Sequence, residues 1–301
     1  MAILTKPRTK RVWFQAASAL VFNAWLPNWL TGKIFQGNVK GVCVPILNCY
    51  SCPSAMGACP IGSLQTFLAG VRLNLAAAEA KFGLYVLGTL GAVGSVVGRM
   101  PCGWLCPFGL LQELMHKIPT PKLKVPRVLS YFRYVVLAVL VVGLPLLVVD
   151  QYGLGETWFC KWVCPAGTLE AGIPLILLNA GLRGLVGFMY YWKVGLLVVF
   201  LGWITVSRRP FCRTVCPLGA IFGLFNKASL FRMAVDDEKC TLCGKCRRDC
   251  PVDIGIYESA NSPNCIRCLK CVDSCTYGAV SYDFLARHEA AEDARLTSSL
   301  R

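Results

Sequence analysis

The sequence predicts an all-α membrane protein with about four transmembrane helices, followed by a small C-terminal α+β module rich in cysteine. Of its 301 residues, 55% are hydrophobic, and the mean hydropathy of +0.53 is typical of membrane proteins. Apolar segments recur up to residue 206, and the composition turns polar from about Asp236. The 18 cysteines are too many for an ordinary cytosolic fold, and the length excludes a small secreted disulfide scaffold. Metal clusters are therefore the leading interpretation.

Four apolar segments approach the length of about 17–25 residues that a helix needs to cross the hydrocarbon core. They cover residues 12–30, 82–98, 131–149 and 189–206. The first contains Asn23 and Pro27, and we favour an uncleaved anchor there over a cleaved signal peptide, because no clear small-residue cleavage site follows. The shorter run 173–188 carries Arg183 and is expected to be re-entrant or interfacial.

Lys and Arg are concentrated in the N-terminal segment, in the loop between the second and third spans, and after the fourth span. The positive-inside rule then places both termini and the C-terminal module in the cytoplasm, with the loops around 31–81 and 150–188 outside. The expected location is the inner (cytoplasmic) membrane of a prokaryote, crossed several times. This bias and the attraction of anionic lipid account for the net charge of +15, so no nucleic-acid partner is inferred.

The chain divides into five parts by composition. These are a basic segment with the first helix (1–40), an outward-facing cysteine-rich loop (41–81), a membrane core (82–235), the cysteine-rich module (236–285) and a polar tail (286–301).

The cysteine-rich module contains the strongest motif, Cys-x-x-Cys-x-x-Cys-x-x-x-Cys, twice, as "CTLCGKCRRDC" and "CIRCLKCVDSC". In two-cluster ferredoxins the fourth cysteine of each run ligates the other [4Fe-4S] cluster. One cluster is therefore expected on Cys240, Cys243, Cys246 and Cys275, and the second on Cys265, Cys268, Cys271 and Cys250. A pair of zinc sites is the alternative, which the doubled run disfavours.

A second repeat, Cys-Pro-x-Gly, occurs four times in the apolar part, as "CPIGSLQ", "CPFGLLQ", "CPAGTLE" and "CPLGAIF". Three copies follow another cysteine by four residues, as in "CGWLCP". Proline favours the first turn of a helix, where free N–H groups and the dipole stabilise a thiolate or an anionic cluster. Each copy therefore predicts a thiolate at a helix N-terminus.

The predicted topology pairs these copies across two membrane faces. The inner face gathers four thiolates for one [4Fe-4S] cluster, from Cys102, Cys106, Cys212 and Cys216. The outer face offers six, and by analogy the best four for another cluster are Cys52, Cys59, Cys160 and Cys164, with Cys43 and Cys49 as alternative ligands or as a bridged pair. Disulfides are the competing interpretation of the outer cysteines. The total expected is about four clusters.

Few other residues suggest chemistry. The two histidines, His116 and His288, and the lack of a Cys-x-x-Cys-His motif argue against haem, and no catalytic residue is identified. Gln65, Gln112 and Glu170 follow three of the Cys-Pro elements at the same offset, for which helix-surface polarity is the simplest explanation.

Residues 82–285, through "CGWLCP", "CRTVCP" and the two ferredoxin runs, resemble the NapH-type membrane polyferredoxins, the membrane portion of NosR and the RdxA/CcoG-like proteins. The resemblance implies an electron-transfer subunit of a quinone-linked complex, working between the quinone pool or a cytoplasmic donor and a periplasmic cytochrome or reductase. The RdxA/CcoG likeness supports a different function, a maturation factor that reduces a metal or thiol during cofactor assembly. A redox sensor is the third hypothesis.

The electron-transfer hypothesis meets one physical difficulty. The hydrocarbon core is about 30 Å thick, too far for one efficient tunnelling step between clusters at its two faces. Either the clusters are sunk into the core, or a quinone or partner bridges the gap. The stretch "NCYSCPSAMGACPIGSLQ", from Asn48 to Gln65, goes beyond the simplest NapH pattern.

Overall fold

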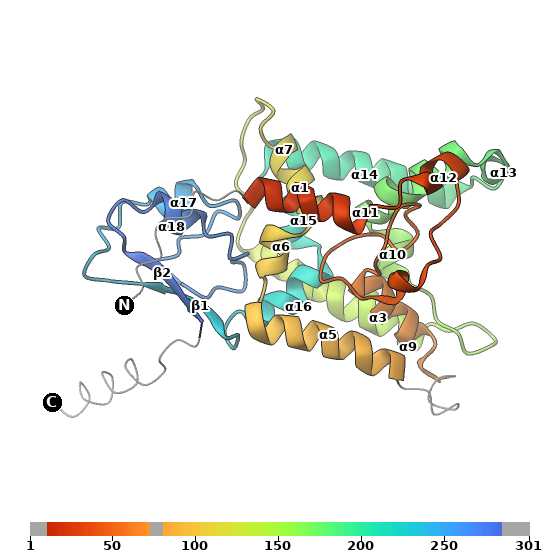
Figure 1. Ribbon diagram of the computed structural model, residues 1–301, viewed down its shortest axis with the longest axis horizontal. Coiled ribbons are helices and arrows are strands. Elements are labelled where there is room, and N and C mark those ends of the chain that lie inside the picture. Colours follow the sequence, from red (N-terminus) through yellow and green to blue (C-terminus); the bar gives the residue numbers. More distant parts are fainter. Residues whose placement is uncertain (1–10, 73–80, 285–301) are drawn as a thin grey trace.

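The computed structural model describes residues 11–72 and 81–284. Helices lie side by side in a bundle, and the cysteine-rich C-terminal module caps one end of it (Figure 1). The short helices α10 (Trp158–Trp162), α12 (Ile173–Leu178) and α13 (Ala180–Arg183) gather toward the opposite end. The molecule therefore has a ferredoxin-like end and a remote end.

Two helical segments in the described residues are long and apolar enough to cross a membrane, Val128–Leu147 and Phe188–Val206 (α14). The first is built from η2 (Val128–Tyr131), α8 (Phe132–Val136), η3 (Leu137–Gly143) and α9 (Leu144–Leu147). The predicted second span forms α5 (Lys81–Val97), which has 17 residues and is shorter. Two of the four expected spans thus meet the criterion of length and composition.

The predicted first span is a shorter helix, α1 (Arg11–Phe22), which ends before Asn23 and Pro27. Its polar residues Arg11, Gln15 and Ser18 face inward, whereas apolar side chains such as Trp13 and Leu20 are exposed. An apolar exterior over a polar interior is expected where lipid surrounds a helix. After α1 the chain forms α2 (Pro27–Thr31) and η1 (Asn38–Gly41).

Every Cys-Pro element begins a helix, as the sequence predicts. The helices are α3 (Pro60–Ala69), α7 (Pro107–Met115), α11 (Pro165–Gly167) and α16 (Pro217–Phe225). In each, the cysteine is the N-cap in an extended conformation and proline holds the first turn. The partner cysteines lie on α6 (Met100–Trp104), α10 and α15 (Pro210–Thr214), and η4 (Thr168–Gly172) joins α11 to α12.

The C-terminal module is a two-stranded antiparallel sheet with two short helices. Strand β1 (Phe231–Val235) pairs with β2 (Val280–Phe284), and α17 (Lys245–Arg248) and α18 (Lys270–Ser274) lie between them in sequence. Phe231, Met233 and Ile256 form its small core. One continuous buried cluster fills the rest of the molecule and includes cysteines from all the membrane-part sets together with Ile46 and Leu47.

Candidate iron–sulfur sites

The ferredoxin-like end contains two tight cavities with cysteine walls. One, of about 30 Å³, is lined by Cys240, Cys243, Cys246 and Cys275. The other, of about 20 Å³, is lined by Cys250, Cys265, Cys268 and Cys271, with Cys246 at its edge. The structure thus brings together the two crossed sets that the motif predicts. In the described ranges no three Cys, His, Asp or Glu side chains converge closely enough to hold a single metal ion, and each set surrounds a space instead.

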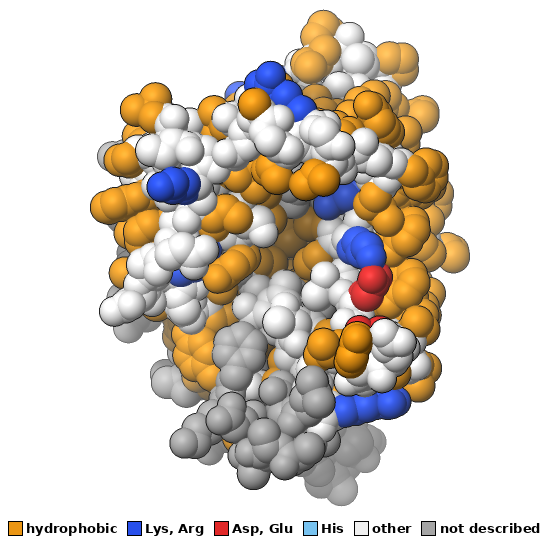
Figure 2. All heavy atoms as spheres, turned by 90° about the vertical axis from the view of Figure 1, so that its right-hand side faces the viewer, with side chains coloured by type: hydrophobic (Ala, Val, Ile, Leu, Met, Phe, Trp, Pro, Cys, Tyr) orange, Lys and Arg blue, Asp and Glu red, His pale blue; other side chains and the backbone are white. Residues whose placement is uncertain are grey.

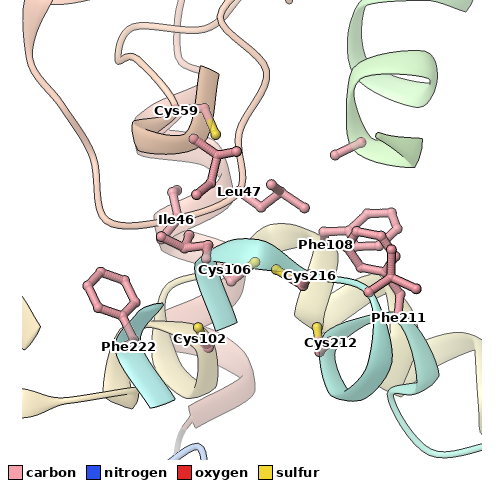
Figure 3. Packing of buried hydrophobic residues seen from close by; sticks show 14 of the residues in the cluster. Ile46, Leu47, Cys59, Cys102, Cys106, Phe108, Phe211, Cys212, Cys216 and Phe222 are labelled. Carbon is pink, nitrogen blue, oxygen red and sulfur yellow. The ribbon is translucent and has the colours of Figure 1, made fainter. Parts of the chain in front are cut away.

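The inner set is buried at the centre of the bundle. Its four cysteines, at the ends of α6, α7, α15 and α16, gather around one space (Figure 3). Each is at most 7% exposed. The four are Cys102, Cys106, Cys212 and Cys216.

Two arginines cross between the halves of this inner set. Arg99 and Arg209 each stand three residues before the first cysteine of their own half. Arg209 Nη1 donates to the carbonyl oxygen of Cys102 at 2.8 Å, and Arg99 Nη2 donates to that of Cys212. The motif glycine of each half allows this approach, because a Cβ at Gly219 would lie 2.5 Å from Arg99 Nη2 and one at Gly109 would lie 3.0 Å from Arg209 Nη1. Each arginine therefore joins its own half of the inner set to the other half through a hydrogen bond to a backbone carbonyl.

Buried guanidinium groups surround the inner set and its contact with the C-terminal module. At most 1% of each of five arginines is exposed, and each has a buried nitrogen without a hydrogen-bond partner among residues 11–72 and 81–284. They are Arg11, Arg99, Arg133, Arg209 and Arg267. Buried cations need a counter-charge, which anionic thiolate-ligated clusters would supply, so this environment fits [4Fe-4S] clusters.

Glu113 ties three parts of the molecule together beside the inner set. Its carboxylate contacts Arg11 of α1, Arg209 at 2.8 Å and Lys270 of α18 at 3.8 Å. Burial disfavours the charged form, but the coulombic attraction of Arg209 and Arg11 outweighs it and holds the pKa of Glu113 below its ordinary value.

The outer cysteines line a much larger cavity, of about 820 Å³, with Cys49, Cys59, Cys160 and Cys164 in its wall. A Cβ at Gly167 would lie 3.6 Å from Cys49 Sγ and 3.8 Å from Cys164 Sγ, so the motif glycine again leaves room beside sulfur. The structure joins none of the described cysteines by a disulfide.

Cys52, which the sequence ranks among the four best outer ligands, lies apart from this wall. Its Sγ is 3.4 Å from Ser54 Oγ and 3.7 Å from Asn23 Oδ1. Cys43 forms a β-bridge with Ala58 and also does not line the cavity. Of the two alternatives named from sequence, Cys49 is therefore the one that meets Cys59, Cys160 and Cys164.

The expectation that Gln65, Gln112 and Glu170 are simply polar residues on the surfaces of their helices is wrong. Gln65 and Gln112 are fully buried. Gln112 Nε2 donates to Cys212 Sγ at 2.9 Å, and Gln65 Nε2 donates to Cys160 Sγ at 3.3 Å. Glu170 Oε2 accepts the backbone N–H of Cys49 at 2.6 Å. Each side chain reaches from its own Cys-Pro helix to the opposite half of the site, and the shared offset was the signal of this role.

The cysteine sets are linked through short stretches of protein. Ile46 and Leu47 belong to the same buried cluster as Cys59 of the outer set and Cys106 of the inner set. Figure 3 shows Ile46 and Leu47 between Cys59 and the inner cysteines. The predicted outer loop therefore dips into the buried core, where Ile46 and Leu47 lie between the two sets.

The C-terminal module also packs against the inner set, through α6. A Cβ at Gly103 would lie 2.4 Å from the carbonyl oxygen of Ile266, and Trp104 Nε1 donates to the carbonyl of Arg267 at 3.0 Å. Arg209, which donates to the carbonyl oxygen of Cys102, also contacts Glu113, and Glu113 in turn reaches Lys270 of the C-terminal module at 3.8 Å.

Comparison with known proteins identifies related sequences. A family model for a 4Fe-4S binding domain matches residues 81–126, 132–174 and 188–235, each match containing one Cys-x-x-x-Cys-Pro element. An uncharacterised protein of Methanocaldococcus jannaschii is 31% identical over 77% of this chain and 80% of its own length. The ferredoxin-type protein NapH of Escherichia coli is 25% identical over 89% and 90%, and the regulatory protein NosR of Pseudomonas aeruginosa is 31% identical over 62% and 25%. No solved structure matches.

Proposed function

The chain belongs to the family of NapH- and NosR-like polyferredoxins, and we propose that it is a multi-pass membrane electron-transfer subunit with about four [4Fe-4S] clusters. The ligand sets are the two crossed ferredoxin sets, the inner set, and an outer set of Cys49, Cys59, Cys160 and Cys164. Each cluster, when bound, accepts and passes on one electron.

The observation that carries this proposal is the continuity of the buried core. Cys59, Cys106 and Cys268, one from each of three successive sets, belong to a single packed cluster of buried residues. Ile46 and Leu47 lie between the outer and inner sets, and Arg209 joins the inner set, through Glu113, to Lys270 of the C-terminal module. Sunken clusters answer the difficulty posed by a bilayer of about 30 Å.

The chain's own residues prepare these sites for a change of charge. A cluster gains one negative charge on reduction, and N–H donors to its sulfurs together with nearby cations stabilise that charge. Gln112 supplies such a donor at the inner set and Gln65 at the outer set. Arg99 and Arg209 add positive charge in a site with little water, where electrostatic interactions are stronger than in solvent.

The proposal also covers the orientation of the chain in the membrane, a bound quinone and redox partner subunits. The distribution of Lys and Arg supports cytoplasmic termini and a cytoplasmic ferredoxin module, with the outer set facing the periplasm. The likeness to NapH supports a quinone and redox partner subunits on the two faces.

Quantification of iron and sulfide, with EPR spectroscopy on anaerobically purified protein, tests the cluster content. We expect about four clusters, from four thiolates per cluster. A content of two clusters would mean that the membrane cysteines are thiols or disulfides and would refute the transmembrane path.

Two single substitutions test the outer set. Cys49→Ser should remove or alter one cluster signal, whereas Cys52→Ser, the matched control three residues away, should leave all signals in place. The reverse pattern would refute the ligand assignment while leaving the cluster count intact.

A further inference from the structure

The outer cavity is far larger than a cluster requires. On the same measure, the two ferredoxin cavities have volumes of about 20 and 30 Å³, and each has four cysteines in its wall. The outer cavity also has four cysteines in its wall, yet its volume is about 820 Å³. Ligand sites for small molecules typically enclose about 300–1,000 Å³. After a cluster has been seated, the outer cavity therefore keeps room for a second molecule.

The cavity is hollowed into the end of the molecule remote from the ferredoxin module. Figure 2 shows a hollow in this face. Small and apolar residues such as Ala171, Gly172 and Leu175 form part of its wall. Lys161 and Lys193 also line it but are engaged, Lys161 with Glu156 and Lys193 with the carbonyl oxygen of Cys160 at 3.2 Å.

Two buried hydrogen-bond donors in the cavity wall have no partner in the part of the chain that the structure describes. Lys40 is 3% exposed, and its Nζ makes no hydrogen bond, although it lies 4.7 Å from the centroid of the Tyr50 ring. Asn48 is fully buried, and its Nδ2 has no partner, whereas its Oδ1 accepts a hydrogen bond from Asn23. A cluster on the outer cysteines would supply negative charge but not the hydrogen-bond acceptors that a buried ammonium group and an unpaired amide donor require.

We propose that this cavity binds a small oxyanion or carboxylate beside the outer cluster, with Lys40 as its counter-ion and Asn48 as a second donor. Both unpartnered groups are donors and one is a cation, which specifies a ligand with negative charge and acceptor oxygens. The proposal rests on the proposed function, because it assumes that Cys49, Cys59, Cys160 and Cys164 hold a cluster.

Formate, sulfate and fumarate serve as probes, added as sodium salts to the reduced full-length protein in detergent, with sodium chloride as the ionic-strength control. The readout is the EPR signal of the outer cluster, identified as the one lost in Cys49→Ser. We expect at least one probe to change this signal saturably and to leave the other clusters unaffected. Lys40→Met should weaken that binding by about tenfold or more, because hydrogen bonds to charged groups contribute about 1.5–3 kcal/mol.

Lys33→Met is the matched control, since Lys33 is exposed and does not line the cavity. Lys40→Arg is the second variant, for the case in which Lys40→Met loses the cluster. It keeps the positive charge and should retain binding. If no probe changes the outer signal, the proposal is overturned and Lys40 serves only to balance the cluster. An iron content that lacks an outer cluster would refute the proposed function instead, and thermal shifts with the same probes would then decide anion binding independently.

Discussion

Replacement of Glu113 by glutamine should destabilise the protein strongly, because one carboxylate holds two buried cations. Its side chain is 15% exposed, and those of Arg11 and Arg209 are 1% exposed. Removing one partner of a buried ion pair costs about 3–5 kcal/mol. The negative charge of a neighbouring cluster offsets part of the loss at Arg209, so we expect the lower end, about 3 kcal/mol. For a domain of 150–250 residues, this corresponds to a fall in Tm of roughly 6–12 °C.

The assay is thermal unfolding under anaerobic conditions in detergent, followed by circular dichroism and by the visible absorbance of the clusters. Glu258→Gln is the matched control, because Glu258 is 39% exposed and contacts Arg127 and Arg247 at the surface. Exposed pairs contribute about 0–1 kcal/mol, so its Tm should change by less than about 4 °C. Equal Tm changes in the two variants would refute the view that Glu113 is a buried tie between α1, α15 and the C-terminal module.

Three further results are expected. Gln112→Leu removes the N–H donor to Cys212 Sγ, so the midpoint potential of the inner cluster should fall by roughly 40 mV, equivalent to about 1 kcal/mol. EPR-monitored titration measures this potential, and an unchanged value would contradict the role of the hydrogen bond. Gly103→Ala places a Cβ 2.4 Å from a ferredoxin-module carbonyl, so it should lower the free energy of unfolding by about 1–3 kcal/mol and speed proteolysis of that module. At the control Gly195→Ala no described atom lies within 4 Å of the new Cβ, and the substitution should slightly stabilise α14. The pKa of Glu113 in the folded protein is lowered from 4.5, so its contribution to folding stability is complete above pH 4.5 and is lost as the pH falls through the folded pKa. The Tm of the wild type should therefore fall more steeply with acid than that of Glu113→Gln, and parallel Tm curves would contradict this linkage.

Some features follow from local chemistry and are readable in the chain. Proline restricts φ to values that suit a first helical turn, and all four Cys-Pro-x-Gly copies begin a helix, whereas Cys52-Pro53 and Cys250-Pro251, which lack the glycine, do not. The two ferredoxin runs likewise specify their crossed cysteine sets, because short spacings allow few arrangements around a cube. The predicted first span was less accurate, since Asn23 and Pro27 end α1 after 12 residues.

Other features depend on contacts between distant segments. Cys49 lines the outer cavity and Cys52 does not, because buried Ile46 and Leu47 anchor an irregular loop whose orientation no periodic pattern encodes. The roles of Gln65 and Gln112 were hinted at by a common offset, yet their partners lie 95 and 100 residues away.

The sequence was sufficient for what a local segment dictates: two long apolar helices, helix starts at the four Cys-Pro-x-Gly copies, and the spacing of the ferredoxin cysteines. The fold was needed for everything that two halves do together. Three features arise from packing across more than one helix: the hydrogen bonds of Arg99 and Arg209 to opposite halves of the inner set, the position of Leu47 between the outer and inner cysteine sets, and the unpaired Lys40 in the outer cavity. Local propensity acts over a few residues, whereas a buried charge is costly or stabilising according to whatever the tertiary fold brings beside it.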